Sequence, residues 1–242
     1  MVNVEEIGPV EIGEEDRLFV LTGAGVSAES GLPTFRDNGG LWNGYLVEDV
    51  ATPEAWHEDA EQVWRFYAMR RRDALSARPN AAHTALARLE QRLGDRFYLC
   101  TQNVDDLHER AGSKRVVHMH GELFRSRCER ACGRGDFFDE GIYTAAAEIP
   151  RCTCGGRIRP HIVWFGETPL FMDEIYAEIE RCTMLLVAGS SGAVYPAAGF
   201  VQWARRRGLR TFYVGPELPL NASQFTERVM ANAGEALPRL FP

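Results

Sequence analysis

The chain has 242 residues, of which 45% are hydrophobic and 25% charged, as in a globular protein large enough for one core with an insertion. The formal net charge of −7 argues against binding to a phosphate backbone, which requires clustered lysine and arginine, so we expect no direct nucleic-acid partner. No apolar run approaches the roughly 20 residues that span a bilayer and the acidic start is unlike a signal peptide, so we expect a cytoplasmic protein without membrane partners.

A strand predicted over Arg17–Thr22 leads into a glycine turn, Thr22–Gly25. An apolar strand followed by closely spaced glycines is typical of a phosphate-binding turn, in which backbone N–H groups approach the ligand. An ordinary dinucleotide-binding helix would continue with apolar periodicity, and an acidic residue would follow about 20 positions later. Here Ser30–Pro33 ends the helix early and Thr34–Asp37 follows, so we expect a loop that covers the nucleotide.

Four further apolar runs predict strands, and helical stretches lie between them. The strands are expected over Arg96–Thr101, Val116–Met119, Thr183–Ala188 and Arg210–Val214. Helices are expected over Ala81–Leu93, between the cap Asn80 and Gly94, over Met172–Arg181, and from Pro196 through Arg207. This alternation predicts an α/β fold: a Rossmann-like, doubly wound parallel sheet covered on both faces.

Two segments interrupt this alternation. Residues 43–79 hold a helix that begins at Thr52-Pro53 and an aromatic-basic run, and residues 122–160 hold four of the six cysteines. We expect both at one end of the sheet, where they form a smaller inserted lobe, with the substrate cleft between the lobes. The predicted domains are a Rossmann-like domain (1–42, 80–121 and 161–242), a helical insertion (43–79) and a zinc-binding insertion (122–160).

The clustered cysteines predict a structural zinc site. Cys128 and Cys132 form one pair, Cys152 and Cys154 form another, and each pair's second cysteine precedes a glycine that lets the turn fold back on a metal. Four thiolates leave no open coordination position for catalysis. The pairs have gaps of three and one residues, so a site that has lost its metal, or one completed by another ligand, stays open. The other two cysteines, Cys100 and Cys182, are expected to be small core residues.

Polar side chains follow two of the predicted strands, at the edge where a doubly wound sheet binds ligands. Gln102–Asp105 follows one strand, and His118–Gly121 ends the next. From the residues alone, Asn103 and Asp105 could equally cap a helix over Asp106–Ala111. A lone histidine in a strand is usually structural, so the pattern by itself does not assign a role to either histidine.

Five segments of the chain, in this order, resemble the sirtuins, which are NAD-dependent protein-lysine deacylases. They read GAGVSAESGLPTFRD, TQNVDDLHERAG, HMHGEL, RPHIVWFGE and GSSGAVYPAAGF, and they lie between about Leu18 and Phe200. The resemblance implies NAD as co-substrate, proteins with acylated lysines as partners, and nicotinamide and O-acyl-ADP-ribose as products. Sirtuins also normally carry a structural zinc ion.

The resemblance also implies roles for individual residues. Asn103 and Asp105 would hold the nicotinamide carboxamide, and Gln102 and Asn103 would contact its ribose. His120, directly before the glycine, would be the general base that deprotonates a ribose hydroxyl, which leaves His118 as a packing residue. Catalytic roles are thus expected for His120 and Asn103, and NAD contacts for Gly23, Ala24, Gly25, Ser27, Ala28, Thr34, Phe35, Arg36, Trp42, Gln102, Asn103, Val104, Asp105, Gly189, Ser190, Ser191, Gly215, Pro216, Glu217 and Ala233.

The segment His161–Glu167 resembles the strand along which sirtuins bind the acyl-lysine peptide by β-augmentation, and the resemblance implies that Val163 and Phe165 contact the substrate. An ordinary core strand is the alternative. Tyr67 and Arg70 are three apart in a predicted helix and resemble the pair found in sirtuins that prefer succinyl-, malonyl- or glutaryl-lysine. A phenol and a guanidinium bind a distal carboxylate well. Otherwise, Tyr67 packs in the core and the arginine is solvated.

Two other functions remain as alternatives. One is transfer of ADP-ribose to a protein, against which His120 argues, because a base for the ribose hydroxyl serves deacylation. The other is a module that binds NAD or acyl-lysine without turnover. Such a module would be expected to carry substitutions among Asn103, Asp105 and His120, and all three residues are present.

Overall fold

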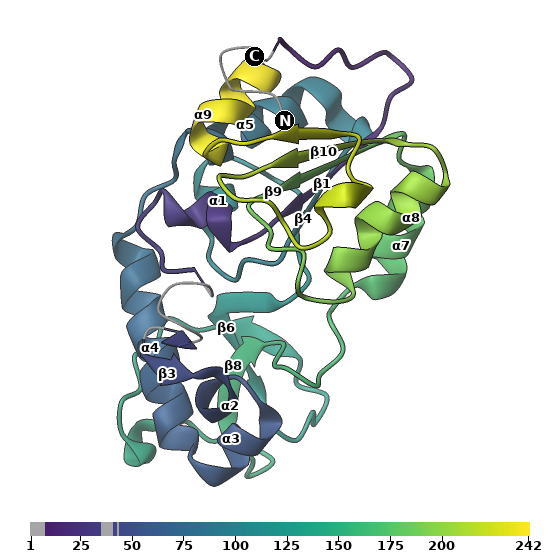
Figure 1. The fold of residues 1–242 in the computed structure, drawn as a ribbon. Helices are drawn as coiled ribbons and strands as arrows, with labels where there is room; N and C mark the ends of the chain where they lie inside the picture. The colour runs from purple at the N-terminus through teal and green to yellow at the C-terminus, as the bar shows by residue number, and fades with distance from the viewer. Residues whose placement is uncertain (1–7, 35–40, 43) are drawn as a thin grey trace.

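The computed structural model describes residues 8–34, 41–42 and 44–242, which form a larger and a smaller lobe (Figure 1). The larger lobe is built on a six-stranded sheet in the order β11-β10-β9-β1-β4-β5, and all neighbouring strands are parallel. The strands are β1 (Leu18–Thr22), β4 (Phe97–Thr101), β5 (Val116–His118), β9 (Met184–Ala188), β10 (Arg210–Val214) and β11 (Glu227–Val229). The predicted doubly wound α/β fold is confirmed.

Alternate residues of β1 point to opposite sides of the sheet, and all five are buried. Helices therefore cover both faces of the sheet. Leu18 and Val20 belong to the core beneath α5 (Ala81–Leu93) and α9 (Ala233–Leu240), whereas Phe19 and Leu21 belong to the core beneath α7 (Met172–Arg181) and α8 (Phe200–Arg206) (Figure 1). Two short helices, α1 (Ala24–Ala28) and α6 (Leu107–Arg110), follow β1 and β4. In the described part of the chain, no helix has the length and apolar character needed to cross a membrane.

The predicted helices agree closely with those observed, and the exceptions are at the C-terminal end. α5 begins and ends as expected, because the Asn80 side chain accepts the N–H of Ala82 at 2.9 Å and Gly94 has a φ of +56°. The helix expected from Pro196 is split into a 3₁₀ turn, Ala197–Gly199, followed by α8. β11 and α9 were not predicted, because β11 has three residues and α9 contains a proline.

The smaller lobe is a three-stranded antiparallel sheet packed against helices. Its sheet has the order β7-β6-β8, with β6 (Gly121–Cys128), β7 (Asp136–Phe138) and β8 (Ile158–Ile162). The other elements are β2 (Leu41–Trp42), β3 (Tyr45–Leu46), α2 (Val47–Val50), α3 (Pro53–Glu58) and α4 (Ala60–Ser76). Thr52 caps α3, as predicted, by accepting the N–H of Ala55 at 3.1 Å.

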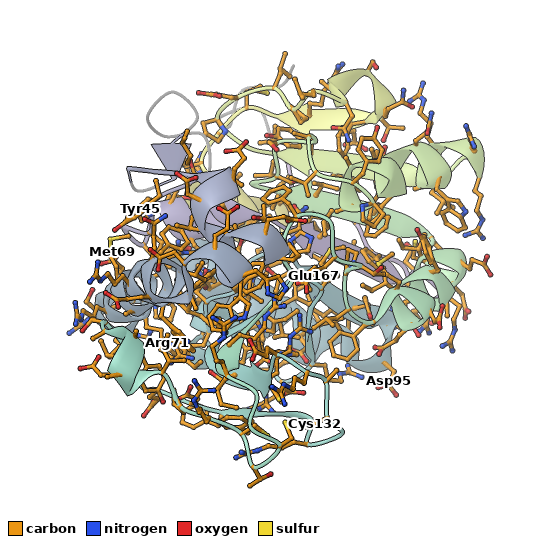
Figure 2. All side chains as sticks on the ribbon, turned by 90° about the horizontal axis from the view of Figure 1, so that it is seen from below. Tyr45, Met69, Arg71, Asp95, Cys132 and Glu167 are labelled. Atoms are coloured by element: carbon orange, nitrogen blue, oxygen red, sulfur yellow. The ribbon has the colours of Figure 1, made fainter. Side chains whose placement is uncertain are left out.

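One hydrophobic core joins the two insertions of the smaller lobe. Trp56, Trp64 and Tyr67 from the helices pack with Leu123 and Trp164 from the sheet side. The completely buried Arg71 side chain, labelled in Figure 2, also joins α4 to β6: its Nε donates to the Leu123 carbonyl at 2.8 Å. The smaller inserted lobe is confirmed, while the domain boundaries given above stay a prediction.

The strand expected over His161–Glu167 is wrong beyond its first two residues, because β8 ends at Ile162. Beyond that residue the backbone N–H groups bond outside the sheet. Val163 donates to the His120 carbonyl at 2.9 Å, and Phe165 donates to the Ala51 carbonyl at 3.0 Å. The segment is therefore an extended loop that connects the two lobes, and not a continuation of the strand.

The turns that follow β1 and β9 pack backbone against backbone. The N–H of Gly25 donates to the Gly189 carbonyl at 2.9 Å, and a Cβ atom at Gly25 would lie 2.8 Å from the Gly189 Cα. Gly189 has a φ of +64°, and a Cβ atom there would lie 2.4 Å from the Val26 nitrogen. The glycines are thus required for the contact between the turns, as well as for access to a ligand.

We expect Gly25→Ala to lower the free energy of unfolding by about 1–3 kcal/mol, because the added methyl group overlaps backbone that cannot move freely. Chemical denaturation measures this change. Gly8→Ala is the control, since no atom lies within 4 Å of its Cβ position, and it should change the free energy by less than about 0.5 kcal/mol. Equal effects of the two substitutions would contradict this account of the turns.

Candidate functional site

A cavity of about 790 Å³ lies between the two lobes. Its walls come from the segments that follow β1, β4, β9 and β10, together with α4 and the loop after β8. These segments follow the carboxyl ends of neighbouring parallel strands, where α/β sheets bind ligands. The volume is in the range of small-molecule and cofactor sites.

Most of the residues predicted to contact NAD line this cavity. They are Ala24, Gly25, Ser27, Ala28, Thr34, Gln102, Asn103, Val104, Asp105, Gly189, Ser190, Ser191, Pro216 and Glu217. Gly23, Gly215 and Ala233 are not part of the lining, and Ala233 is buried in the core at the start of α9. Phe35 and Arg36 lie outside the described residues, as does the side chain of Trp42.

A hydrogen-bond network joins three of these residues. The Ser27 hydroxyl donates to Asp105 Oδ2 at 3.0 Å and accepts the Asn103 side-chain amide at 3.0 Å. Burial raises the pKa of the Asp105 carboxyl, although hydrogen bonds from the Leu107 N–H and from Ser27 oppose the rise. Asp105 Oδ1 accepts that N–H at 3.2 Å from Leu107, the first residue of α6, and Asp105 also lines the cavity. The amide and the carboxylate together offer the donor and acceptor that a carboxamide requires.

His118 does more than the packing expected of it. Its Nδ1 donates to the Asn103 carbonyl at 2.9 Å, and its Nε2 lies 2.8 Å from Glu109 Oε1. Both partners are acceptors, so the two bonds together require a protonated ring. Burial by itself lowers the pKa of His118, but the hydrogen bond and charge of Glu109 bring it above its ordinary value. His118 therefore holds the backbone of Asn103, a role that depends on α6 bringing Glu109 close.

His120 lines the cavity in the turn between β5 and β6. The next residue must be glycine, because Gly121 has a φ of +86° and a Cβ atom there would lie 2.0 Å from the His161 carbonyl oxygen. Burial lowers the pKa of the His120 imidazole, and a hydrogen bond with the Gln102 backbone opposes this effect. The ring is therefore neutral at neutral pH and able to accept a proton.

The predicted substrate residues Tyr67, Arg70, Val163 and Phe165 also line the cavity. Tyr67 is completely buried, and burial raises the pKa of its phenol to about 12, so it stays protonated. Burial lowers the pKa of Arg70, and the nearby Tyr67 and Asp105 oppose this shift. Tyr67 is thus both a core residue and a wall of the cavity, and Arg70 is not simply part of a solvated stripe.

Two further lining residues, Trp164 and Glu167, were not predicted as site residues. They stand beside Val163 and Phe165 in the RPHIVWFGE segment. A strand over this segment would have pointed alternate residues to opposite faces. In the loop that forms instead, all four line the cavity. Their position beside the two predicted substrate residues was the signal in the sequence. The prediction of a strand assigned Trp164 to the opposite face and so left it out of the site.

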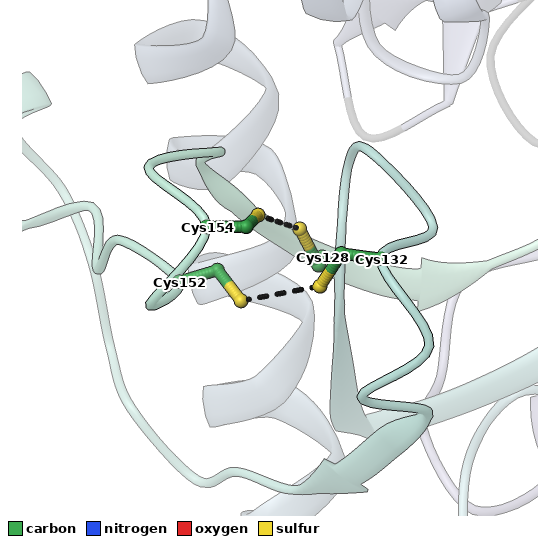
Figure 3. A group of neighbouring side chains, drawn as sticks. All are labelled: Cys128, Cys132, Cys152 and Cys154. Carbon is green, nitrogen blue, oxygen red and sulfur yellow. Dashed lines mark hydrogen bonds between the residues drawn. The ribbon is translucent and has the colours of Figure 1, made fainter.

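The four clustered cysteines lie side by side in the smaller lobe (Figure 3). Their sulfur atoms all lie within 4.8 Å of one another, and the Cys128–Cys154 and Cys132–Cys152 distances are both 3.5 Å. Tetrahedral zinc with Zn–S bonds of 2.3 Å places its sulfurs about 3.8 Å apart, so the set fits one zinc ion. The unequal gaps between the cysteines do not prevent this convergence.

The surroundings of the cysteines fit a closed, structural metal site. A Cβ atom at Gly156 would lie 3.1 Å from Cys128 Sγ, so the turn after Cys154 needs glycine to fold back. All six cysteines are free of disulfides, and Cys100 and Cys182 are buried in the core, as predicted. None of the four clustered cysteines is among the residues described as lining the cavity. A metal ion held by them supports the fold of the lobe and does not act on a ligand in the cavity.

We expect purified protein to contain one zinc ion per chain, and Cys154→Ser to lose it and to lower the unfolding temperature, because a serine hydroxyl replaces a thiolate ligand. Metal analysis and thermal unfolding measure the two effects. Cys182→Ser is the control: this thiol donates to the Ile179 carbonyl at 3.1 Å, a bond that a hydroxyl can also make. A wild-type zinc content in Cys154→Ser would contradict the assignment.

Comparisons with known proteins agree with this geometry. The model of the Sir2 family matches residues 23–196. A protein of Shewanella oneidensis named NAD-dependent protein deacylase is 48% identical over 225 residues, which is 92% of each chain. One of the same name from Escherichia coli K12 is 47% identical over 231 residues, which is 94% of this chain and 82% of the relative.

Solved structures show the same fold. A Sir2 homologue in complex with NAD has a TM-score of 0.85 and 39% identity, with 97% of this chain and 94% of the other covered. A Sir2 homologue mutant in complex with ADP-ribose has a TM-score of 0.85 and 42% identity, with 93% and 90% covered. The family match, the identity over nearly the whole length and the shared fold agree with the five sequence segments, and the chain therefore belongs to the Sir2 family, the sirtuins.

Proposed function

We propose that this protein is an NAD-dependent protein-lysine deacylase that releases nicotinamide, free lysine and O-acyl-ADP-ribose. The observation that carries this proposal is the meeting of Asn103, Asp105 and His120 in one cavity between the lobes. The names of the relatives support the same activity. A module that only binds NAD would not need a neutral histidine in the same cavity as the amide and the carboxylate.

The cavity residues fit NAD. The network of Asn103, Ser27 and Asp105 would hold the nicotinamide carboxamide, and the glycine turns after β1 and β9 would approach the phosphates. When bound, NAD supplies the ribose carbon that receives the acyl oxygen and the ribose hydroxyl that completes the transfer. Gln102 accepts a hydrogen bond from the Ser190 hydroxyl at 2.9 Å, which links the turn after β9 to the segment after β4.

His120 would remove the proton from that ribose hydroxyl. Its neutral ring has an acceptor nitrogen, and its lowered pKa keeps the acceptor available at neutral pH. The carbonyl of the same residue accepts the Val163 N–H at 2.9 Å, so the base is tied directly to the loop proposed to bind the substrate. This link would keep the distance and orientation between the base and the acylated lysine constant.

The acyl-lysine peptide would bind along Val163 and Phe165. The N–H groups of both residues already donate within the protein, so pairing with a peptide main chain would use the carbonyl oxygens of this loop. Main-chain pairing places few demands on the sequence of the substrate. We therefore propose proteins with exposed acylated lysines as partners, without a strict sequence motif.

Tyr67 and Arg70 would select acyl groups that end in a carboxylate, such as succinyl and malonyl. Both line the cavity from α4. The protonated phenol and the guanidinium are donors, as a carboxylate requires. Acetyl-lysine would also be accepted, because its smaller group fits the same space and leaves the arginine to be solvated.

We expect His120→Ala to lower the rate of NAD-dependent deacylation by about 100-fold or more, with NAD affinity and fold largely kept. Mass spectrometry of peptide products measures the rate and also detects any transferred ADP-ribose. His57→Ala, at an exposed position, is the control. The base is active when neutral and its pKa is lowered, so the acid limb of kcat/KM should fall below about pH 6.5. Wild-type rates in folded His120→Ala would exclude this mechanism.

We expect Arg70→Met to lower the ratio of desuccinylation to deacetylation, measured as kcat/KM, by roughly 10- to 150-fold, the value of a charge-assisted hydrogen bond. Tyr67→Phe should act in the same direction but more weakly. The matched control is Arg72→Met, on the same helix but exposed, which should leave the ratio unchanged. If Arg70→Met reduced both activities equally, the arginine would serve the fold or NAD binding, and the proposed acyl preference would fail.

A further inference from the structure

The indole N–H of Trp164 determines how the Tyr67 hydroxyl bonds. Trp164 Nε1 donates to Tyr67 Oη at a distance of 3.1 Å, and both side chains are buried. An indole nitrogen can only donate, whereas a phenol can donate one hydrogen bond and accept others. Tyr67 must therefore use a lone pair for Trp164, which leaves its own proton to be donated elsewhere. Because Tyr67 lines the cavity, this proton is available for a hydrogen bond to a ligand there.

The position of Trp164 is itself set by an ion pair. The Arg159 guanidinium lies over the indole ring, 3.3 Å from its centroid. It also makes two hydrogen bonds to the Glu167 carboxylate, at 2.8 and 2.9 Å. The backbone N–H of Trp164 donates to the same carboxylate at 2.9 Å. The loop after β8 is thus closed on itself by a planar, bidentate pair stacked on the indole.

The charge state of this pair is well defined. Glu167, labelled in Figure 2, also lies 3.2 Å from the Arg127 guanidinium. Burial by itself raises the pKa of the Glu167 carboxyl, but the hydrogen bonds from Arg159 and from the Trp164 backbone bring it below its ordinary value. The carboxylate is therefore ionised at neutral pH and keeps both Arg159 and the Trp164 backbone in place.

We propose that Trp164 is a specificity-determining residue, which orients the Tyr67 hydroxyl as a donor toward the distal carboxylate of an acyl group, and that Arg159 and Glu167 are positioning residues for it. The inference rests on the acyl preference proposed above. An acetyl group has no distal acceptor, so it gains nothing from an oriented donor. The contribution of Trp164 should therefore be visible in the ratio of desuccinylation to deacetylation and not in deacetylation itself.

The experiment compares Trp164→Phe with Trp56→Phe in the full-length protein. Trp56 is an equally buried tryptophan whose ring packs 5.9 Å from that of Trp164, but its N–H donates to Glu129 at 2.9 Å and not to Tyr67. Both variants lose one indole and one hydrogen bond from the same core. The measured quantity is kcat/KM for a succinyl-lysine peptide and for the acetyl-lysine peptide of the same sequence. Thermal unfolding shows whether each variant is folded.

Trp164→Phe should lower the succinyl-to-acetyl ratio by about 2- to 12-fold, the factor that one neutral hydrogen bond is worth, mainly through KM for the succinyl peptide. Trp56→Phe should leave the ratio unchanged. In a Tyr67→Phe background, adding Trp164→Phe should change the ratio by less than about 2-fold, because the hydroxyl that it orients is absent. Arg159→Lys should lower the ratio in the wild-type background but not together with Trp164→Phe.

Two results would overturn the inference. If Trp164→Phe and Trp56→Phe lower both activities alike, Trp164 is only part of the core. If the effects of Trp164→Phe and Tyr67→Phe on the ratio multiply independently, Trp164 does not act through Tyr67. Both results leave the proposed acyl preference intact. If instead Arg70→Met and Tyr67→Phe leave the ratio unchanged, that preference itself fails, and the inference fails with it.

Discussion

The close contact between the turns after β1 and β9 is the constraint on which the site depends. These strands are neighbours at the centre of the sheet, and the backbones of Gly25 and Gly189 touch directly. No side chain fits between them, so the two turns form one continuous wall at the carboxyl edge. Ser27, in α1 after β1, bonds to Asn103, and Ser190, after β9, bonds to Gln102. Gln102 and Asn103 both follow β4. The order β9-β1-β4 in the sheet thus brings these lining segments together.

The smaller lobe closes this cavity through α4. One side of the helix completes the core shared by the two insertions, and Tyr67 and Arg70 present polar groups to the cavity. The buried Arg71 joins the helix to β6, the strand that ends at Cys128. A metal ion held by the cysteine cluster would therefore stabilise, at a distance, the sheet against which α4 packs. This separation explains why a structural metal is useful to a lobe with a small core.

Burial acts on the ionisable groups of the cavity in a consistent way. It raises the pKa of Asp105 and Tyr67 and lowers that of His120, so each shift favours the neutral form. The neutral His120 ring has an acceptor nitrogen and the neutral Tyr67 phenol has a proton to donate, which are the forms that their proposed roles require. Glu167 in the cavity wall is an exception, as is His118 outside the lining, because direct ion pairs compensate for their burial. Those two residues hold other residues in place.

The sequence by itself determined the elements whose signals are local. Apolar runs identified β1, β4, β5, β9 and β10, and the cap at Asn80 identified the start of α5. An apolar run and a capping residue can both be recognised from residues that are adjacent in the chain. The glycine turns, the His120-Gly121 pair and the cysteine pairs were recognised for the same reason. The tertiary structure alone decided that the segment after Ile162 leaves its sheet, since the N–H groups of Val163 and Phe165 bond to residues far away in the chain. It also decided that the ion pair with Glu109 stabilises the protonated form of His118 and that Trp164 bonds to Tyr67, because each pair is brought together only by tertiary packing.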